Sequence, residues 1–398
     1  MPDDADTLVE RYALLGLALG RHVDGLVDAY YGPPDLAARA ARGQPEPPAV
    51  LAARARELLA DLAADRSLGD RRRAWLEAQA RGLATTAAVL AGERLGYLDE
   101  VEAAYGVRPR EVSDDELAAA HRRLDDVLPG SGPVGERLVS WREAQRVPPD
   151  RLGAAVASIA DDLRERTGRL FGLPDGERVD FELVDHKPWS GFNYYLGGLR
   201  SRVAINTDLP VLATGLGHLV AHEAYPGHHT EHSRKEVGLV RARSQLEETI
   251  FLVGTPQCLL AEGLADLGLE IVVGRHPQQW LAGHLHPLGI PYDADLAGEV
   301  AEAGEVLGAV RGNAAIALHE RGVDPDEVTR YVQRWSLTTP ERAAKAVEFL
   351  TDPTWRAYVF CYIEGVARCR SFAAGDPGRF RRLLDEQLVP ADLESGAA

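Results

Sequence analysis

The residues from His222 to His229 carry the strongest chemical signal in the sequence, which reads His-Glu-Ala-Tyr-Pro-Gly-His-His there. They follow an apolar run, residues 211–221, that predicts a buried helix. A His-Glu pair on a helix, with a further histidine one or two turns later, is typical of zinc hydrolases. In such sites the histidines bind zinc and the glutamate takes a proton from water. We therefore predict that His222 is a zinc ligand and that Glu223 is the general base.

The second histidine ligand is either His228 or His229, because the spacing departs from the usual motif. In that motif the second ligand comes four residues after the first, and this position is Pro226. A straight helix would return His229 to the face of His222. A break at Pro226-Gly227 would bring in His228 instead. We favour His228, because a proline inside a helix removes a backbone hydrogen bond and implies such a break.

A third ligand is expected from a second helix, and Glu262 is the best candidate. It lies in an apolar segment, residues 259–270, that predicts another buried helix. A buried carboxylate is costly unless it is paired or binds a metal. Two histidines and one glutamate form a known catalytic zinc set that leaves a coordination position for water. Asp266, one turn further on, is expected to orient a ligating histidine. The weaker candidates Glu247 and Glu248 lie in a polar segment.

These motifs resemble the domain-of-unknown-function 885 family, which is placed among the zincin-like metallopeptidases. Its nearest types are the mostly helical neurolysin and carboxypeptidase Taq enzymes. The resemblance covers roughly residues 180–375 and is strongest at the metal motif. Three further segments match in the family's order: the strand 201–207 before the metal helix, Arg311 with His319, and Tyr362 with Gly365.

The resemblance implies a mainly α, zincin-like and neurolysin-like helical fold with a small β-sheet beside the metal helix. It also implies that Tyr362 and His319 donate hydrogen bonds to the negative charge that develops on a substrate oxygen. The sequence departs from the family pattern at Ala315, where aspartate is common. Tyr358 stands where the family often has glutamine, one turn before Tyr362, and is an alternative donor.

The elements that must hold these residues are mainly helical. Two segments with alternating or β-branched residues predict a small sheet, whose second strand is a candidate for pairing with an extended peptide. Helix is expected again from residue 211 to about residue 386. We expect an N-terminal helical lobe, residues 1–172, and a catalytic zincin-like part, residues 173–398. The expected early helices are 6–29, 48–64, 70–97, 113–127, 134–145 and 149–170, and the expected strands are 178–184 and 200–207.

Composition narrows the class of protein. The 398 residues can bury a large core, and a net charge of −17 without a basic block disfavours nucleic-acid and anionic-membrane partners. The three cysteines lack the spacing of a cysteine zinc site or a disulfide framework. Neither a signal peptide nor an apolar run of membrane-spanning length is recognisable. We therefore expect a cytoplasmic protein. The family resemblance implies that its substrate is a small peptide.

The expected function is that of a zinc-dependent hydrolase, and specifically a metallopeptidase that cleaves short peptides. One alternative is a zinc amidase of another small substrate. The other is a non-catalytic helical binding protein with a degenerate metal site. Four of the twelve histidines lie between residues 222 and 232, which favours metal binding over packing because histidine is a middling core residue.

Overall fold

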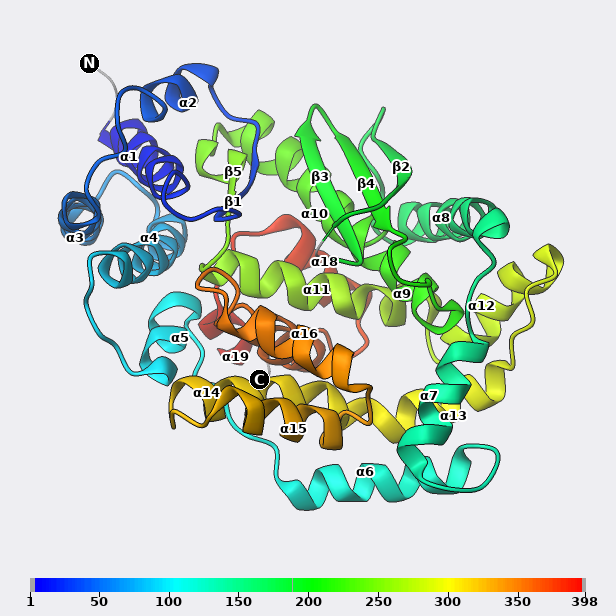
Figure 1. The fold of residues 1–398 in the computed structure, drawn as a ribbon. Coiled ribbons are helices and arrows are strands. Elements are labelled where there is room, and N and C mark those ends of the chain that lie inside the picture. Colours follow the sequence, from blue (N-terminus) through cyan, green and yellow to red (C-terminus); the bar gives the residue numbers. More distant parts are fainter. Residues whose placement is uncertain (1–3, 188, 396–398) are drawn as a thin grey trace.

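The computed structural model describes residues 4–187 and 189–395 and shows a mainly helical chain with two small β-sheets (Figure 1). This confirms the expected mainly α fold. Within the described residues, no helix is both long enough and apolar enough to cross a membrane. The three cysteines are unpaired and buried.

The first helices form a group of their own at one side of the molecule (Figure 1). They share a core in which Tyr12 and Trp75 are fully buried and meet edge to face. The sequence predicts a helix over residues 6–29, but the helix ends at Leu19 and a strand follows. This strand is held by pairing with a segment far along the chain, which local patterns do not contain. The elements are α1 (Asp4–Leu19), β1 (Val27–Tyr30), α2 (Pro34–Ala40), α3 (Pro48–Ala64) and α4 (Asp70–Leu90).

The next four helices pack with the catalytic part of the chain. Their apolar faces belong to the same hydrophobic core as the metal helices, the two helices that contain residues 213–223 and 256–273. By contrast, α1–α4 share a separate core with Ile250 and Leu252. The two clusters of buried residues therefore divide between residues 90 and 97, and the expected boundary near residue 173 stays a prediction. The long amphipathic helix before that boundary buries its apolar stripe against the metal helices. The four helices are α5 (Tyr97–Tyr105), α6 (Asp114–Val127), α7 (Val134–Ala144) and α8 (Pro149–Phe171).

The larger sheet lies beside the metal helices. Its order is β2 (Arg178–Val184), β4 (Arg200–Asn206), β3 (Gly191–Gly197), with β2 parallel and β3 antiparallel to β4. The sequence predicts β2 and β4 and misses β3. Because β4 is the middle strand, both of its edges are already paired, so it cannot accept a peptide as the sequence suggests. The strand with an unpaired edge next to the metal helices is β3.

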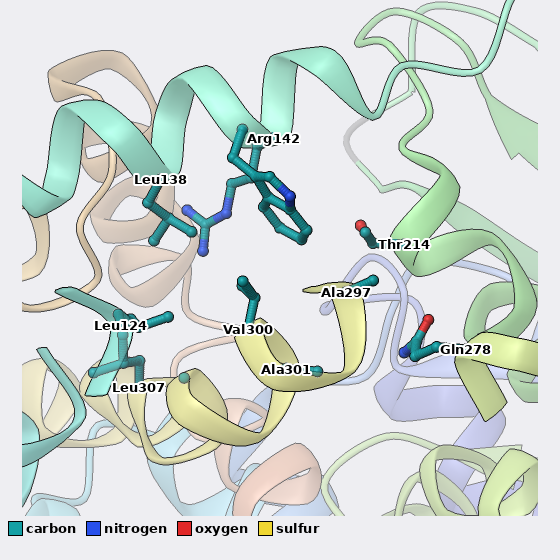
Figure 2. A pocket seen from close by; sticks show the side chains of 11 residues that line it. Leu124, Leu138, Arg142, Thr214, Gln278, Ala297, Val300, Ala301 and Leu307 are labelled. Carbon is teal, nitrogen blue, oxygen red and sulfur yellow. The ribbon is translucent and has the colours of Figure 1, made fainter. Parts of the chain in front are cut away.

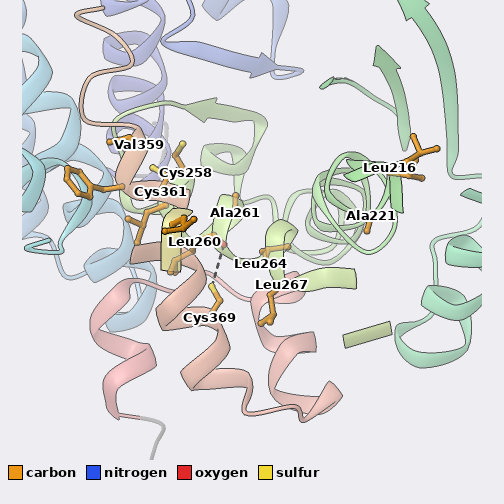
Figure 3. Packing of buried hydrophobic residues seen from close by; sticks show 14 of the residues in the cluster. Leu216, Ala221, Cys258, Leu260, Ala261, Leu264, Leu267, Val359, Cys361 and Cys369 are labelled. Carbon is orange, nitrogen blue, oxygen red and sulfur yellow. Dashed lines mark hydrogen bonds between the residues drawn. The ribbon is translucent and has the colours of Figure 1, made fainter. Parts of the chain in front are cut away.

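The helix α11 (Pro256–Val273) runs through the middle of the molecule and is buried along most of its length (Figure 1). Figure 3 shows its side chains Leu260, Ala261, Leu264 and Leu267 in the core that also contains Leu216 and Ala221 of the first metal helix. Small residues let other backbones approach α11 closely.

Two of these close approaches bear on the site. A Cβ atom on Gly263 would overlap the backbone of Gly365, and one on Gly268 would lie 2.9 Å from Cγ of Pro226. The remaining elements are β5 (Ile250–Leu252), α12 (Pro277–Leu285), α13 (Ala294–Gly304), α14 (Val310–His319), α15 (Pro325–Trp335), α16 (Pro340–Thr351), the π-helical turn Cys361–Gly365, α17 (Val366–Ala373), α18 (Pro377–Asp385) and α19 (Pro390–Ser395).

Candidate metal centre

The metal motif folds as two helices joined by a tight turn. The helix α9 (Ala213–Glu223) ends just before a cis Tyr225-Pro226 peptide, and α10 (His228–Lys235) begins two residues later. The amide of Gly227 donates a hydrogen bond of 2.9 Å to the carbonyl of Ala221. A Cβ atom at Gly227 would overlap the carbonyl of His222, so only glycine fits. The chain therefore breaks where the sequence predicts a break.

The turn brings His228 back to His222, and α11 adds Glu262 to the pair. The Nε2 atoms of the two histidines lie 3.1 Å apart. Each of these nitrogens lies 3.4 Å from an oxygen of Glu262. All three side chains are nearly buried, with 10%, 11% and 5% of the side-chain surface exposed for His222, His228 and Glu262.

These distances match the donor set of a tetrahedral zinc ion. Ligand atoms at about 2.0–2.2 Å from zinc in tetrahedral directions lie about 3.3–3.5 Å from one another. Oε2 of Glu262 is buried and has no hydrogen-bond partner, which is costly for a carboxylate unless a cation satisfies it. The residues therefore fit a zinc ion, which His222, His228 and Glu262 would hold.

Asp266 orients His222 from the other side of the ring. Its Oδ1 accepts a hydrogen bond of 2.7 Å from Nδ1 of His222, which leaves Nε2 of that ring as the lone-pair nitrogen. Nε2 of the exposed His218, one turn earlier on α9, lies 3.2 Å from the same oxygen. Burial alone would raise the pKa of Asp266, but hydrogen bonds from His218 and His222 hold it far below its usual value. Asp266 therefore stays ionised, as an orienting carboxylate must.

Glu262 is held by a residue that the sequence offers only as an alternative donor. The hydroxyl of Tyr358 donates a hydrogen bond of 2.7 Å to Oε1 of Glu262. Although burial alone would raise the pKa of Glu262, the charge of His228 and hydrogen bonds from both histidines lower it to about 2. Glu262 is therefore ionised, and Tyr358 fixes its orientation.

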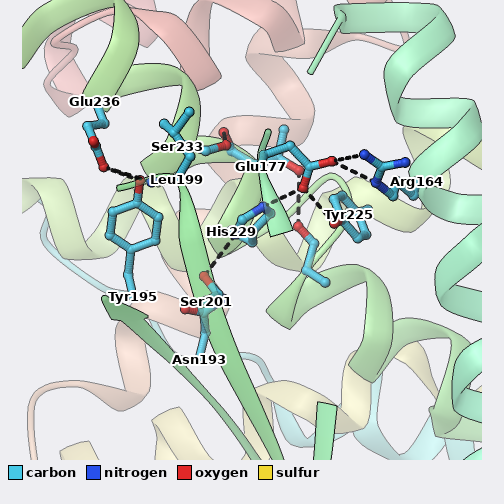
Figure 4. A network of polar contacts seen from close by, with 12 residues as sticks. Arg164, Glu177, Asn193, Tyr195, Leu199, Ser201, Tyr225, His229, Ser233 and Glu236 are labelled. Carbon is cyan, nitrogen blue, oxygen red and sulfur yellow. Dashed lines mark hydrogen bonds and ion pairs between the residues drawn. The ribbon is translucent and has the colours of Figure 1, made fainter. Parts of the chain in front are cut away.

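His229 lies outside this cluster, in a separate polar network (Figure 4). Its Nε2 lies 2.8 Å from Oε2 of Glu177, and its Nδ1 lies 2.9 Å from the hydroxyl of Ser201. Glu177 also accepts hydrogen bonds from Tyr225, at 2.7 Å, and from Arg164, at 2.6 Å. Both ring nitrogens of His229 are thus engaged in tying the turn to the sheet.

Glu223 is the last residue of α9 and directly follows His222. Burial raises the pKa of its carboxyl, and the nearby charges of His222 and His228 act in the opposite direction. Its backbone carbonyl accepts a hydrogen bond of 2.5 Å from Asn193 of β3. Gly191 lies so close that a Cβ atom there would be 3.2 Å from Oε1 of Glu223. The strand β3 therefore fixes the position of the expected base.

Tyr362 faces the same cluster from the π-helical turn. Its ring centroid lies 6.4 Å from that of His222 and 5.3 Å from that of Tyr358. Burial and the charge of Glu262 raise the pKa of Tyr362 well above its usual value, so its hydroxyl stays protonated and can donate. The close contact of Gly263 with Gly365 sets this turn against α11.

The structure places His319 against Leu350 and Tyr97, and the role that the family resemblance implies for it stays a prediction. Its Nε2 lies 2.6 Å from the carbonyl of Leu350, and its ring packs on Tyr97 at 4.8 Å between centroids. Burial lowers its pKa below the usual value, so it is a neutral ring. A histidine at the end of α14 that bonds the end of α16 joins these two helices.

Two residues near the cluster escape the sequence patterns. Asn193 lies on the missed strand β3. Asp28 lies on β1, where the sequence predicts a helix. Burial raises the pKa of Asp28 to about 7, with His228 lowering it and with Glu262 and Glu223 raising it. In the local sequence, the only sign of Asp28 as a candidate is that a carboxylate stands in the segment Val27–Tyr30.

A cavity of about 230 Å³ lies away from the cluster, between α6, α7, α13 and the start of α9 (Figure 2). The guanidinium of Arg142 points into it among apolar side chains. None of the cluster residues lines this cavity, so it is separate from the metal site. Its walls are Leu124, Leu138, Trp141, Arg142, Thr214, Gln278, Ala297, Val300, Ala301, Gly304 and Leu307.

Comparisons with known proteins give information on the fold and none on the chemistry of the site. No family model and no curated protein matches the sequence. Among solved structures, a protein described as a "putative lipoprotein" from Colwellia psychrerythraea matches with a TM-score of 0.50 and 16% identity, over 87% of this chain and 66% of that one. A "putative lipoprotein of unknown function" from Shewanella oneidensis has a TM-score of 0.49 and 12% identity, over 90% and 74%. At such identities the first match indicates a shared fold only, and this chain spans about two thirds of its length.

Proposed function

We propose that this protein is a zinc-dependent hydrolase, and specifically a metallopeptidase of short peptides related to the domain-of-unknown-function 885 family. The observation that carries the proposal is the convergence of His222, His228 and Glu262, whose Nε2 atoms lie 3.1 Å apart and each 3.4 Å from one of the two oxygens of Glu262. A glutamate follows the first ligand directly. This is the composition of a catalytic zinc site.

Each side chain has a different role in the proposed hydrolysis. Zinc, when bound, supplies a Lewis acid and lowers the pKa of water. Glu223 accepts a proton from the attacking water, and its buried position favours that transfer. The hydroxyl of Tyr362 donates to the negative charge that develops on the carbonyl oxygen. Asp266 and Tyr358 hold His222 and Glu262 in the orientation that the ligands need.

The edge strand β3 favours a peptide over another amide as substrate. Within the described residues β3 pairs only with β4, so its outer edge carries unpaired backbone groups. That edge begins at Gly191, which lies against Glu223. An extended peptide can add to such an edge as a further strand, with its backbone held by hydrogen bonds beside the base. A small non-peptide amide gains nothing from this edge.

The test is the metal content of protein purified without chelators, followed by digestion of a mixed peptide library. We expect about one zinc per chain, as for catalytic sites of this ligand type, and cleavage of short peptides. Protein that holds no zinc and takes none up would contradict the hydrolase and favour the binding protein. Zinc-loaded protein that leaves every peptide intact would favour the amidase. The cytoplasmic location stays a prediction from the sequence.

The variant Glu223→Gln separates the base from the ligands. It should retain zinc, because Glu223 is not a ligand in this proposal. Its turnover should fall by roughly two to four orders of magnitude, the usual contribution of a general base. Elemental analysis and a peptide cleavage assay on the same preparation measure both quantities. Loss of zinc from this variant would make Glu223 a ligand and overturn the assignment.

A further inference from the structure

The cavity between α6, α7, α13 and the start of α9 has the composition of a small-molecule site (Figure 2). Its volume of about 230 Å³ exceeds the roughly 150 Å³ of a buried apolar cavity that accepts benzene. Most of its walls are apolar, and the polar residues among them are Arg142, Thr214 and Gln278. Ligand pockets in proteins commonly combine an apolar lining with a few polar groups that fix the orientation of the ligand.

Arg142 supplies the cavity with a half-buried positive charge. Its guanidinium points into the cavity among apolar side chains (Figure 2). Within the part of the chain that the structure describes, its side chain bonds only the carbonyl of Leu337, at 3.4 Å, and forms no ion pair. Burial lowers the pKa of Arg142, and the charge of Arg342 acts in the same direction. Arginine nevertheless keeps its proton in proteins, so no described residue neutralises the charge.

The other two polar residues add hydrogen-bond donors to the cavity. The hydroxyl of Tyr292 donates to the amide oxygen of Gln278, so the amide nitrogen of that side chain is the group left to donate. Thr214 is the second residue of α9, whose first turn has no side-chain cap. A helix begins with partial positive charge, because its first amides have no partner within the helix. Among the described residues that line the cavity, none is acidic. The cavity therefore favours an anion.

The apolar walls decide which kind of anion fits. A phosphate or sulfate ion would contact Arg142 and otherwise meet side chains such as Leu138 and Val300, which cannot bond its oxygens. A carboxylate on an apolar body instead places its two oxygens at the guanidinium, in the paired geometry that arginine favours. Its apolar part is then removed from water by the walls. A free amino acid also carries an ammonium group, for which the lining residues provide no carboxylate.

We propose that this cavity binds a small organic acid that has one carboxylate and an apolar body, with Arg142 as the residue that binds the carboxylate. This site is separate from the metal centre, because none of its lining residues belongs to the histidine and glutamate cluster. Binding here does not depend on the proposed hydrolysis.

The experiment uses 3-phenylpropanoate as the probe, because its ring has the size of benzene and its short chain ends in a carboxylate. Calorimetric titration into the full-length protein compares it with 3-phenylpropanamide, which has no charge, and with phenylalanine, which adds an ammonium group to the same skeleton. We expect the acid to bind about ten- to a hundredfold more tightly than the amide, as for a charge-assisted hydrogen bond. Phenylalanine should bind more weakly than the acid.

Two variants and a matched control locate the binding. Arg142→Gln should lose about ten- to a hundredfold in affinity for the acid. Arg123→Gln is the control, since it removes an exposed arginine from α6, and it should bind as the wild type does. Ala301→Phe keeps Arg142 and fills the cavity from an exposed position, so that folding is not at risk. It should weaken binding of the acid by at least about tenfold.

The metal centre is the competing location, since zinc also binds carboxylates. His228→Ala removes a proposed metal ligand and should leave the affinity for the acid unchanged. Binding that His228→Ala loses and Arg142→Gln keeps would place the acid at the metal centre and overturn the inference. Equal affinity for the acid and the amide, normal binding by Ala301→Phe, or no binding of the acid at millimolar concentration would overturn it too. The proposed hydrolase activity would stand in each of these cases.

Discussion

At the scale of single residues, the two neighbouring histidines His228 and His229 have opposite surroundings. His228 faces His222 and Glu262 with one nitrogen of its ring. His229 is fully buried and has both nitrogens engaged by Ser201 and Glu177. Their types and their positions in the chain are nearly identical, so only the direction of the first turn of α10 distinguishes a ligand from a structural residue.

Separate alanine variants of these histidines should therefore fail in different ways. His228→Ala should reduce zinc affinity by more than about a hundredfold, beyond what is lost when an outer partner of a ligand is removed. His229→Ala should keep zinc affinity within about tenfold and lower the free energy of unfolding by about 1–3 kcal/mol, since buried hydrogen bonds are lost. Competition with a zinc indicator and chemical denaturation measure the two effects. Equal zinc loss from both variants would contradict this division.

The pair Tyr358 and Tyr362 shows a similar division of labour. Tyr362→Phe should lower kcat by roughly tenfold to a thousandfold with little change in KM, because its hydrogen bond to the oxyanion forms in the transition state. Tyr358→Phe should mainly weaken zinc binding, by about ten- to a hundredfold, because its hydroxyl orients Glu262. Steady-state kinetics at saturating zinc and zinc titrations separate these outcomes. A Tyr362→Phe protein with normal kcat beside an inactive, zinc-loaded Tyr358→Phe protein would reverse the roles.

At the scale of elements, the turn between α9 and α10 and the small residues of α11 build the site together. The turn fits against α11 because Gly268 leaves room for Pro226. On the other side of α11, Gly263 leaves room for the backbone of Gly365 and thereby for the turn that carries Tyr362. Glycine on a buried helix costs about 1 kcal/mol relative to alanine, and here it permits approaches that no side chain would allow.

Gly227→Ala is the sharpest test of the turn. The added methyl group would overlap the carbonyl of His222, so α9 and α10 would have to separate. We expect a large loss of zinc affinity together with a lower melting temperature. Gly153→Ala is a suitable control, since a Cβ atom there meets open space on the exposed side of a helix. Normal zinc binding by Gly227→Ala would show that the turn can relax and that the close approach is not essential.

At the scale of the whole molecule, a buried polar cluster joins the N-terminal helices to the catalytic part. Arg72 of α4 forms two hydrogen bonds of 2.7 Å with Glu247, which has no exposed surface. Gln387 donates to Glu247 and to Glu248, at 3.0 Å and 2.9 Å. Because β1 belongs to the N-terminal part and pairs with β5, the docking of the two cores also fixes the smaller sheet.

Arg72→Ala should destabilise the protein by about 3 kcal/mol, near the lower end for a broken buried ion pair, because the Arg72 side chain keeps 21% of its surface exposed. The neighbouring Arg71 pairs with Glu386 at the surface, with 67% of its side chain exposed. Its removal should cost less than about 1 kcal/mol. Urea denaturation of both variants measures the difference. Equal stability of the two proteins would mean that the buried pair does not hold the cores together.

The helical class and the three proposed metal ligands follow from local sequence. Apolar periodicity depends on neighbouring residues, and it predicts α3, α6, α7 and α8 closely. The His-Glu pair, the proline at the usual ligand position and the carboxylate in an apolar helix are likewise local signals. They are sufficient to select His222, His228 and Glu262. In the structure the nearest side-chain atoms of each pair of these residues lie 3.1–3.4 Å apart.

The tertiary structure alone decides what depends on segments that are distant in sequence. The strand β1 forms because β5 pairs with it, and β3 forms at the edge of β4, so neither shows in a local period. The family resemblance offers His319 as a hydrogen-bond donor, yet packing places it against Leu350. Tyr31, at the end of β1, packs on Tyr195 of β3 only because these distant segments meet in the fold. Local patterns record which face of a helix or strand is apolar. Contacts between distant segments determine which helices and strands pack together. The side chains that surround the site come from several such elements, so the local sequence does not specify them.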